Sequence, residues 1–135
     1  MARGKDVHQA RQADLNIAGK VVAKRCKSKC ELCGINDSLK LFEVTPIDKH
    51  EVNPERCIMV CHTCYDQIHA KASQALDTHH WMCLHESVWS EYAVVQVVAW
   101  RMLQRLSDQA WARDLIEQMY MDEDTLAWAQ DGAKK

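Results

Sequence analysis

The chain has 135 residues, 47% of them apolar, with only four glycines and two prolines. A chain of this size forms one domain, or a small metal-binding module joined to one helical body. It contains no apolar run long enough to cross a membrane, and its N-terminal residues lack the apolar segment of a secretory signal. The composition therefore predicts a cytoplasmic, mainly α-helical protein with no membrane partner.

Charge is unevenly distributed along the chain, although the formal net charge is only −2. Residues 1–29 carry eight Lys or Arg against two acids, a balance of +6, and residues 30–135 carry nine against seventeen, a balance of −8. A basic arm of this kind can bind nucleic acid. It can also balance a negatively charged metal site, because Arg25, Lys27 and Lys29 directly precede the first cysteine pair. The sequence leaves both interpretations open.

The seven cysteines give the strongest signal in the sequence. Two Cys-x-x-Cys pairs, Cys30/Cys33 and Cys61/Cys64, are separated by a segment long enough for a β-hairpin. Pairs with this separation typically bind one tetrahedral Zn²⁺. In a chain without an export signal, cysteines also favour metal binding over disulfides. We therefore predict one structural zinc ion on Cys30, Cys33, Cys61 and Cys64.

The residues around the two pairs predict a treble-clef or zinc-ribbon-like module. Apolar residues recur in 39–44, and 57–60 is a continuous apolar run that leads into the second pair. Gly34 can adopt the positive φ that a metal-binding turn often needs. Nothing in residues 65–72 breaks a helix. A turn, a hairpin and a helix that begins at the second pair are the parts of a treble clef.

The segments outside this module predict helices on both sides of it. We expect a basic N-terminal helix in residues 1–25, the zinc-binding module in 26–72, a C-terminal helical region in 73–130 and a tail in 131–135. The predicted fold class is therefore mainly α with a small β-hairpin, in which a zinc module is joined to a C-terminal helical body.

Helical periodicity divides the C-terminal region into an apolar face and a polar stripe. The apolar face of its first long helix consists of Val95, Val98, Ala99, Met102 and Leu106. The polar stripe consists of Arg101, Gln104, Arg105 and Asp108. Ser107 or Asp108 can cap a second helix, and Asp122 or Asp124 can cap a last one.

Cys26 and Cys57 give both pairs the same Cys-x3-Cys-x2-Cys spacing. That spacing also occurs where an iron–sulfur cluster is held with one open coordination site. Such clusters perform radical chemistry inside a large barrel, which 135 residues cannot form. We interpret Cys57 as a small buried hydrophobe and Cys26 as a spare thiol near the site.

A second metal site is an alternative interpretation of residues 73–85. The candidate ligands there are His79, His80, Cys83 and His85. Imidazole and thiolate groups both bind zinc. The competing interpretation is a connector whose Trp81, Cys83 and Leu84 contact the core.

Several short segments make the chain resemble the small proteins named after the alkylphosphonate-utilisation gene phnA, here called the PhnA type. These segments are residues 28–34, 41–46, 57–61, 80–84, 87–91, 94–98 and 126–129. The resemblance implies a zinc-binding cytoplasmic bacterial protein, and it implies little about activity because the name records a gene neighbourhood. We expect a structural zinc that supports a recognition surface without catalysis, with a protein or nucleic acid as partner.

A weaker resemblance is to HNH nucleases, which build a catalytic metal site on a treble clef. Counting back from Pro46 places Phe42 and Glu43 at the positions of that family's catalytic pair, and Tyr65 stands where a helical His is usual. Phe42 supplies neither a base nor a metal ligand. The alternative function is a divergent metal-dependent nuclease or phosphoester hydrolase. Its candidate residues are Glu43, Asp48, His50 and His69.

Overall fold

The structure is a computed structural model that describes residues 2–47, 51–71 and 76–132, with the backbone alone described for 2–9 and 132. The chain is mostly helical, with one small antiparallel hairpin among the described residues, as the sequence predicted. The elements are α1 (Ala2–Arg25), β1 (Lys40–Glu43), η1 (Pro54–Arg56), β2 (Cys57–Val60), α2 (His62–Ile68), η3 (His80–Cys83), α3 (Leu84–Ser87), α4 (Ala93–Arg105), α5 (Ala110–Gln118) and α6 (Glu123–Gly132).

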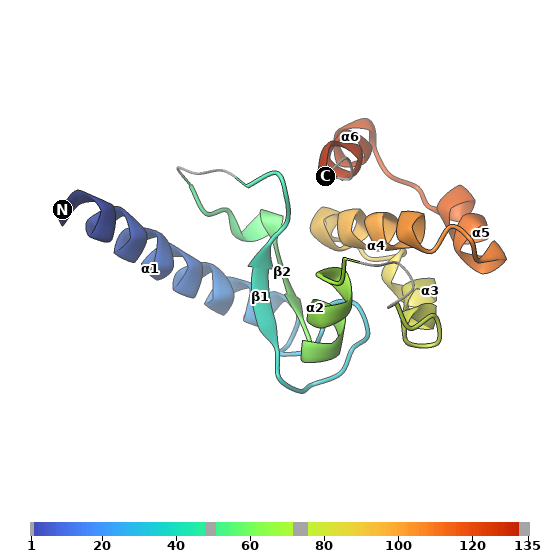
Figure 1. Ribbon diagram of the computed structural model, residues 1–135, viewed down its shortest axis with the longest axis horizontal. Helices are drawn as coiled ribbons and strands as arrows, with labels where there is room; N and C mark the ends of the chain where they lie inside the picture. The colour runs from blue at the N-terminus through green and yellow to red at the C-terminus, as the bar shows by residue number, and fades with distance from the viewer. Residues whose placement is uncertain (1, 48–50, 72–75, 133–135) are drawn as a thin grey trace.

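Figure 1 shows α1 and the hairpin on one side of the molecule and α3 to α6 on the other, with α2 between them. The N-terminal half of α1 extends beyond the hairpin. No helix of the described residues is long and apolar enough to cross a bilayer. The predicted tail begins inside α6, which continues to Gly132, and residues 133–135 lie outside the described part.

Strand β2 is buried on both faces, which explains its continuous apolar run. Because successive side chains of a strand point to opposite faces, Cys57 and Met59 pack with Ala18 and Val22 of α1. The alternate residues of β2 belong to the main core. Strand β1 pairs with β2 from Lys40 opposite Val60 to Glu43 opposite Cys57. The predicted interpretation of Cys57 as a small buried hydrophobe is confirmed.

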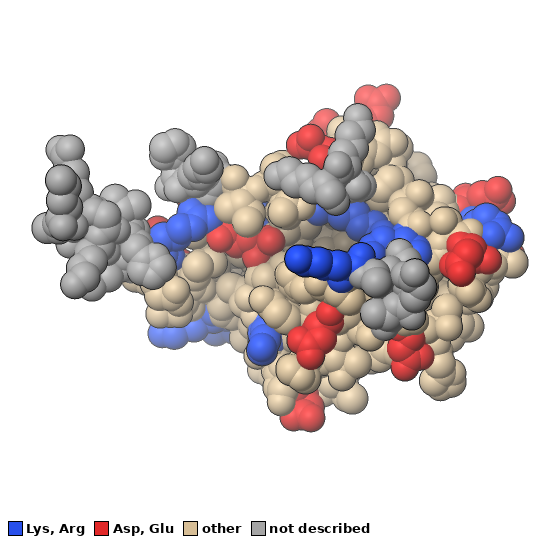
Figure 2. Space-filling model, in the orientation of Figure 1, with Lys and Arg blue, Asp and Glu red and all other residues tan. Residues whose placement is uncertain are grey.

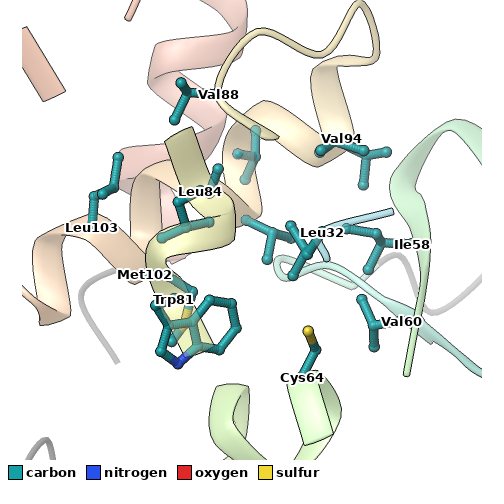
Figure 3. Packing of buried hydrophobic residues seen from close by; sticks show 14 of the residues in the cluster. Leu32, Ile58, Val60, Cys64, Trp81, Leu84, Val88, Val94, Met102 and Leu103 are labelled. Atoms are coloured by element: carbon teal, nitrogen blue, oxygen red, sulfur yellow. The ribbon is translucent and has the colours of Figure 1, made fainter. Parts of the chain in front are cut away.

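The main core is continuous from the hairpin to the C-terminal helices. Figure 3 shows Leu32 and Ile58 of the cysteine-rich module (residues 26–72) in one cluster of buried side chains with Leu84 and Met102 of the helical body. Trp81 is fully buried at the junction, which agrees with the predicted core connector. The cysteine-rich module therefore shares its core with the helices instead of packing as a separate body.

Helix α4 occupies the centre of the helical body and contacts α3, α5 and α6. Its predicted apolar face is buried. Two members of the predicted polar stripe bind backbone carbonyls of neighbouring elements. Arg101 donates to the carbonyls of Thr45, Trp128 and Ala129. Arg105 donates to the carbonyls of Gln67, Ile68 and Ala70 at the end of α2.

The predicted helix caps were right for α6 and wrong for α5. The Thr125 amide donates to Asp122 Oδ1 over 2.8 Å, so Asp122 caps α6. Hydrogen bonds from the backbone and the side chain of Thr125 lower the pKa of the Asp122 carboxyl. Helix α5 instead begins after Gln109, which makes no side-chain cap hydrogen bond. The carbonyl of Ser107 accepts from Arg113, and that contact stabilises the turn before α5 without a cap.

Candidate metal centre

Four cysteine side chains converge between the hairpin and α2. The Sγ atoms of Cys30, Cys33, Cys61 and Cys64 all lie within 4.8 Å of one another. Cys30 Sγ is 3.7 Å from Cys64 Sγ, and Cys33 Sγ is 3.5 Å from Cys61 Sγ. A tetrahedral metal with metal–sulfur bonds of about 2.3 Å separates its sulfurs by roughly 3.8 Å. The four thiols therefore fit a single tetrahedral ion, and none of them forms a disulfide.

The first pair lies in a tight turn that its own backbone closes. The Cys30 amide donates to the Ile35 carbonyl over 2.8 Å, and the Gly34 amide donates to the Cys30 carbonyl over 2.9 Å. The Cys33 amide points at Cys30 Sγ, 3.4 Å away. Gly34 has φ +80°, the left-handed conformation predicted for it, in which a side chain would be strained.

The second pair repeats this geometry at the start of α2. Cys61 is the N-cap residue of α2, and its Sγ accepts from the Cys64 amide over 3.4 Å. The Tyr65 amide donates to the Cys61 carbonyl over 2.9 Å. Each pair thus directs one amide N–H at one of its own sulfurs. Such hydrogen bonds favour the thiolate form, which is the form that binds metal.

The first turn is fixed by contacts from three other elements. Glu31 pairs with Met59 of β2 through two hydrogen bonds of 2.9 Å, one from its amide and one to its carboxylate. Arg25 of α1 binds the Glu31 carboxylate with Nε and Nη2 at 3.0 and 2.6 Å. From α3, Ser87 Oγ donates to the Leu32 carbonyl. The turn therefore holds its two cysteines in a defined orientation.

Arg25 was predicted to balance the charge of a metal site, but its guanidinium pairs with a carboxylate instead. Its guanidinium pairs with Glu31 and also donates to the carbonyls of Pro54 and Cys57. It therefore neutralises a carboxylate and ties α1 to the hairpin. Lys27 and Lys29 are exposed beside the first turn. Their predicted balancing of a metal site stays a prediction.

His80 is a neighbour of the metal centre that the ligand spacing did not predict. Its Nε2 atom lies 3.1 Å from Cys64 Sγ, and its ring packs edge-on against Trp81 with centroids 5.0 Å apart. In the sequence His80 stood only in a candidate second site. Within the described part of the chain, His79, His80, Cys83 and His85 form no metal-binding group. The position of His80 before a core tryptophan was the one available signal.

Without a bound metal, the cysteine thiols of the centre differ in pKa, so they do not ionise equally. The hydrogen bond with Cys64 lowers the pKa of Cys30 to about 4, and the same contact raises the pKa of Cys64. Burial raises the pKa of Cys33 to about 12. Cys83, beside the centre, has its pKa raised to about 12, first by burial and then by the charge of the nearby cysteines. A divalent cation would displace these protons on binding.

The structure also places two of the residues considered for a nuclease site. Glu43 pairs with Arg11 through contacts of 2.6 and 2.5 Å, so its carboxylate is already occupied. His69 Nδ1 contacts the Tyr65 carbonyl at 2.8 Å, and its ring lies 5.2 Å from that of Phe42. Both residues line one cleft. Asp48 and His50 lie outside the described residues.

Comparisons with protein-family models, with curated proteins and with solved structures found no match to this chain. The functional argument therefore depends on the geometry and chemistry of the site.

Proposed function

We propose that this chain is a non-catalytic zinc-binding protein of the PhnA type. One Zn²⁺ bound by Cys30, Cys33, Cys61 and Cys64 has a structural role, and the surface that it stabilises recognises a partner. The fold of the module is a treble clef, in which a metal-binding turn, a hairpin and a helix meet at one ion. The protein functions in the cytoplasm, where thiols stay reduced and available to metal.

The observation that carries this proposal is the spacing of the four sulfur atoms. Sulfur–sulfur distances of 3.5 and 3.7 Å suit a metal of zinc's size in tetrahedral coordination. Soft thiolate ligands in this geometry select zinc or iron, and a lone ion on four cysteines is the common structural zinc site. The amide N–H groups of Cys33 and Cys64 stabilise the charge that the thiolates bring.

A zinc ion with four cysteine ligands is not expected to catalyse a reaction, because its coordination number is already complete. Four thiolates fill a tetrahedral shell and leave no position for water or substrate. A catalytic zinc usually has three protein ligands and one exchangeable position. The metal therefore acts on the fold, since it joins the turn before β1 to the start of α2.

The partner is a protein or a nucleic acid, and the positive charge of the basic arm (residues 1–29) is the reason to include nucleic acid. Four lysines of this arm, Lys20, Lys24, Lys27 and Lys29, are exposed. The described arginines of the arm, Arg11 and Arg25, are both in ion pairs within the chain. Recovery of the partner with and without nuclease treatment distinguishes the two classes. Binding that falls steeply with salt would favour nucleic acid.

Metal analysis of the native protein tests the proposal. We expect one zinc per chain, and a cobalt-substituted sample with the visible absorption of tetrahedral cobalt bound to thiolates. Removal of the metal with a chelator should unfold the hairpin and α2, because site formation and folding are coupled. Iron in place of zinc, or a chain that folds fully without metal, would contradict the proposal.

A further inference from the structure

A cleft of about 700 Å³ lies between β1, the end of α2 and α4. Its polar lining includes His69, Lys71, Arg101, Gln104 and Arg105. Figure 2 shows Lys and Arg side chains gathered in and beside a hollow in the middle of this face. We call it the basic cleft. Its volume is typical of pockets that bind small molecules, which span about 300–1,000 Å³.

The basic cleft carries an excess of positive charge. Among the described residues, no acid forms an ion pair with Arg101 or Arg105, and the one acid in the lining, Glu43, is paired with Arg11. Burial lowers the pKa of Arg101, and the charge of Asp131 only partly opposes this effect. A half-buried guanidinium without a carboxylate partner is costly, and a bound anion would compensate for it.

The two arginines are held in place by main-chain groups. Arg101 makes four hydrogen bonds, to Thr45 and to the carbonyls of Trp128 and Ala129. Arg105 binds three carbonyls at the end of α2 and just beyond it. A guanidinium has five N–H groups, so each arginine retains at least one donor beyond these contacts. Donors fixed in this way lose little entropy when they bind an anion.

An apolar wall lies next to these donors. The lining includes Phe42, Val98 and Met102, and the Phe42 ring is 5.2 Å from the ring of His69. A ligand with an anionic end and a planar apolar end would contact both walls. Phosphate suits the anionic end, because guanidinium groups bind phosphate oxygens well. A phosphate monoester can also carry two negative charges, which can pair with more than one cationic side chain of the cleft.

We propose that the basic cleft binds a small phosphate monoester whose apolar group packs against Phe42. Its phosphate lies between Arg101, Arg105 and Lys71. This inference rests on the proposed function, because the metal at Cys61 and Cys64 fixes α2, which forms one wall of the cleft. The site would be the recognition surface that the metal supports.

The competing explanation is that Arg101 and Arg105 only cap the ends of α6 and α2. Replacing either arginine would disturb the fold under both explanations, so the test uses exposed residues of the lining. Lys71 and Gln104 are exposed, and neither side chain forms a hydrogen bond or ion pair with another of the residues that the structure describes. Lys71→Glu and Gln104→Glu each place negative charge beside the phosphate. Lys20→Glu on α1 and Gln118→Glu on α5 make the same changes on exposed residues outside the cleft.

Calorimetric titration of the metal-loaded full chain with phenyl phosphate measures the binding, and metal content is determined on the same sample. We expect saturable binding with a dissociation constant below about 1 mM. Inorganic phosphate should bind more weakly, and phenol should not bind. Lys71→Glu and Gln104→Glu should each weaken binding about tenfold or more, while Lys20→Glu and Gln118→Glu should leave it unchanged.

Four results would overturn the proposal. The first is no saturable binding of phenyl phosphate by a folded, metal-loaded chain, and the second is an equal loss of binding in the cleft and control variants. The third is inorganic phosphate binding as tightly as the ester, and the fourth is tight binding of a single-stranded oligonucleotide without binding of phenyl phosphate. The first of these, with one zinc per chain, leaves the proposed function standing. Binding of phenyl phosphate by a folded chain without metal would support the cleft and contradict the role of the zinc.

Discussion

The Nε2 atom of His80 lies 3.1 Å from the Sγ atom of Cys64, although the two residues are sixteen positions apart in the sequence. With its proton on Nε2, the imidazole donates to this sulfur. A hydrogen bond to a metal-bound thiolate disperses its charge and orients it. Because Trp81 is fully buried next to it, His80 is held at this position by the core. The helical body thus contributes a group to the candidate metal centre.

The first prediction concerns this contact. His80→Ala should keep one metal per chain and lower its metal affinity about 10- to 100-fold, as loss of an outer-shell partner typically does. Competition with a chelator measures the affinity. His79→Ala, at the exposed neighbouring position, should leave it unchanged. Unchanged affinity in His80→Ala would refute the role, and complete loss of metal would make His80 a ligand.

The second prediction concerns the ion pair between Arg25 and Glu31, whose side chains are only 13% and 4% exposed. Arg25→Ala leaves the Glu31 carboxylate buried without its guanidinium. The free energy of unfolding should fall by about 3 kcal/mol, as expected when one partner of a buried pair is removed. Urea denaturation of the metal-loaded protein measures it. The exposed control Lys24→Ala should change stability by less than about 0.5 kcal/mol, and a similar effect in both variants would be inconsistent with the pair's role.

The third prediction uses two glycines in different conformations. Gly34 has φ +80°, so Gly34→Ala should destabilise the first metal-binding turn by about 1 kcal/mol, although the added methyl meets nothing within 4 Å. Gly19 is helical, and its added methyl would meet Leu41 at 3.8 Å, an ordinary contact. Gly19→Ala should therefore stabilise α1 by roughly 0.5–1 kcal/mol. Thermal unfolding compares the two, and a loss of stability in both variants would contradict the expected signs.

The fourth prediction addresses the alternative nuclease function. The Glu43 carboxylate is paired with Arg11, and Phe42 offers no ligand beside it. A general base must be free to accept a proton, and a catalytic metal needs an open site with ligands. We therefore expect no cleavage of supercoiled or single-stranded DNA with magnesium, manganese or nickel. Nicking that depends on metal and disappears in Glu43→Ala or His69→Ala would place the protein among enzymes.

The sequence predicted those features that depend on residues close together in the chain. The two turns with their cysteines, the positive φ of Gly34 and the cap at Asp122 all follow from local spacing. The burial of β2 on both faces also followed from its apolar run. Four thiols with this spacing have few ways to meet, which is why the candidate ligands come together.

Contacts between distant segments were not predictable in the same way. The approach of His80 to Cys64 depends on how η3 packs against α2. Arg105 was predicted only as part of a polar stripe, and its donation to carbonyls 35 to 38 residues away did not follow from the sequence. The sequence pattern of a polar residue on a helix is the same whether water or a neighbouring backbone carbonyl accepts its hydrogen bonds. Tertiary packing decides between the two.

The metal content of single cysteine variants tests the central claim most directly. Cys30→Ser, Cys33→Ser, Cys61→Ser and Cys64→Ser should each lose the zinc, because one lost thiolate leaves an incomplete tetrahedral site. Cys26→Ser and Cys57→Ala should keep one zinc per chain, since their side chains pack outside the cluster. Elemental analysis of the six purified variants gives the answer. A full zinc content in Cys61→Ser, or loss of zinc in Cys26→Ser, would contradict the assigned ligand set.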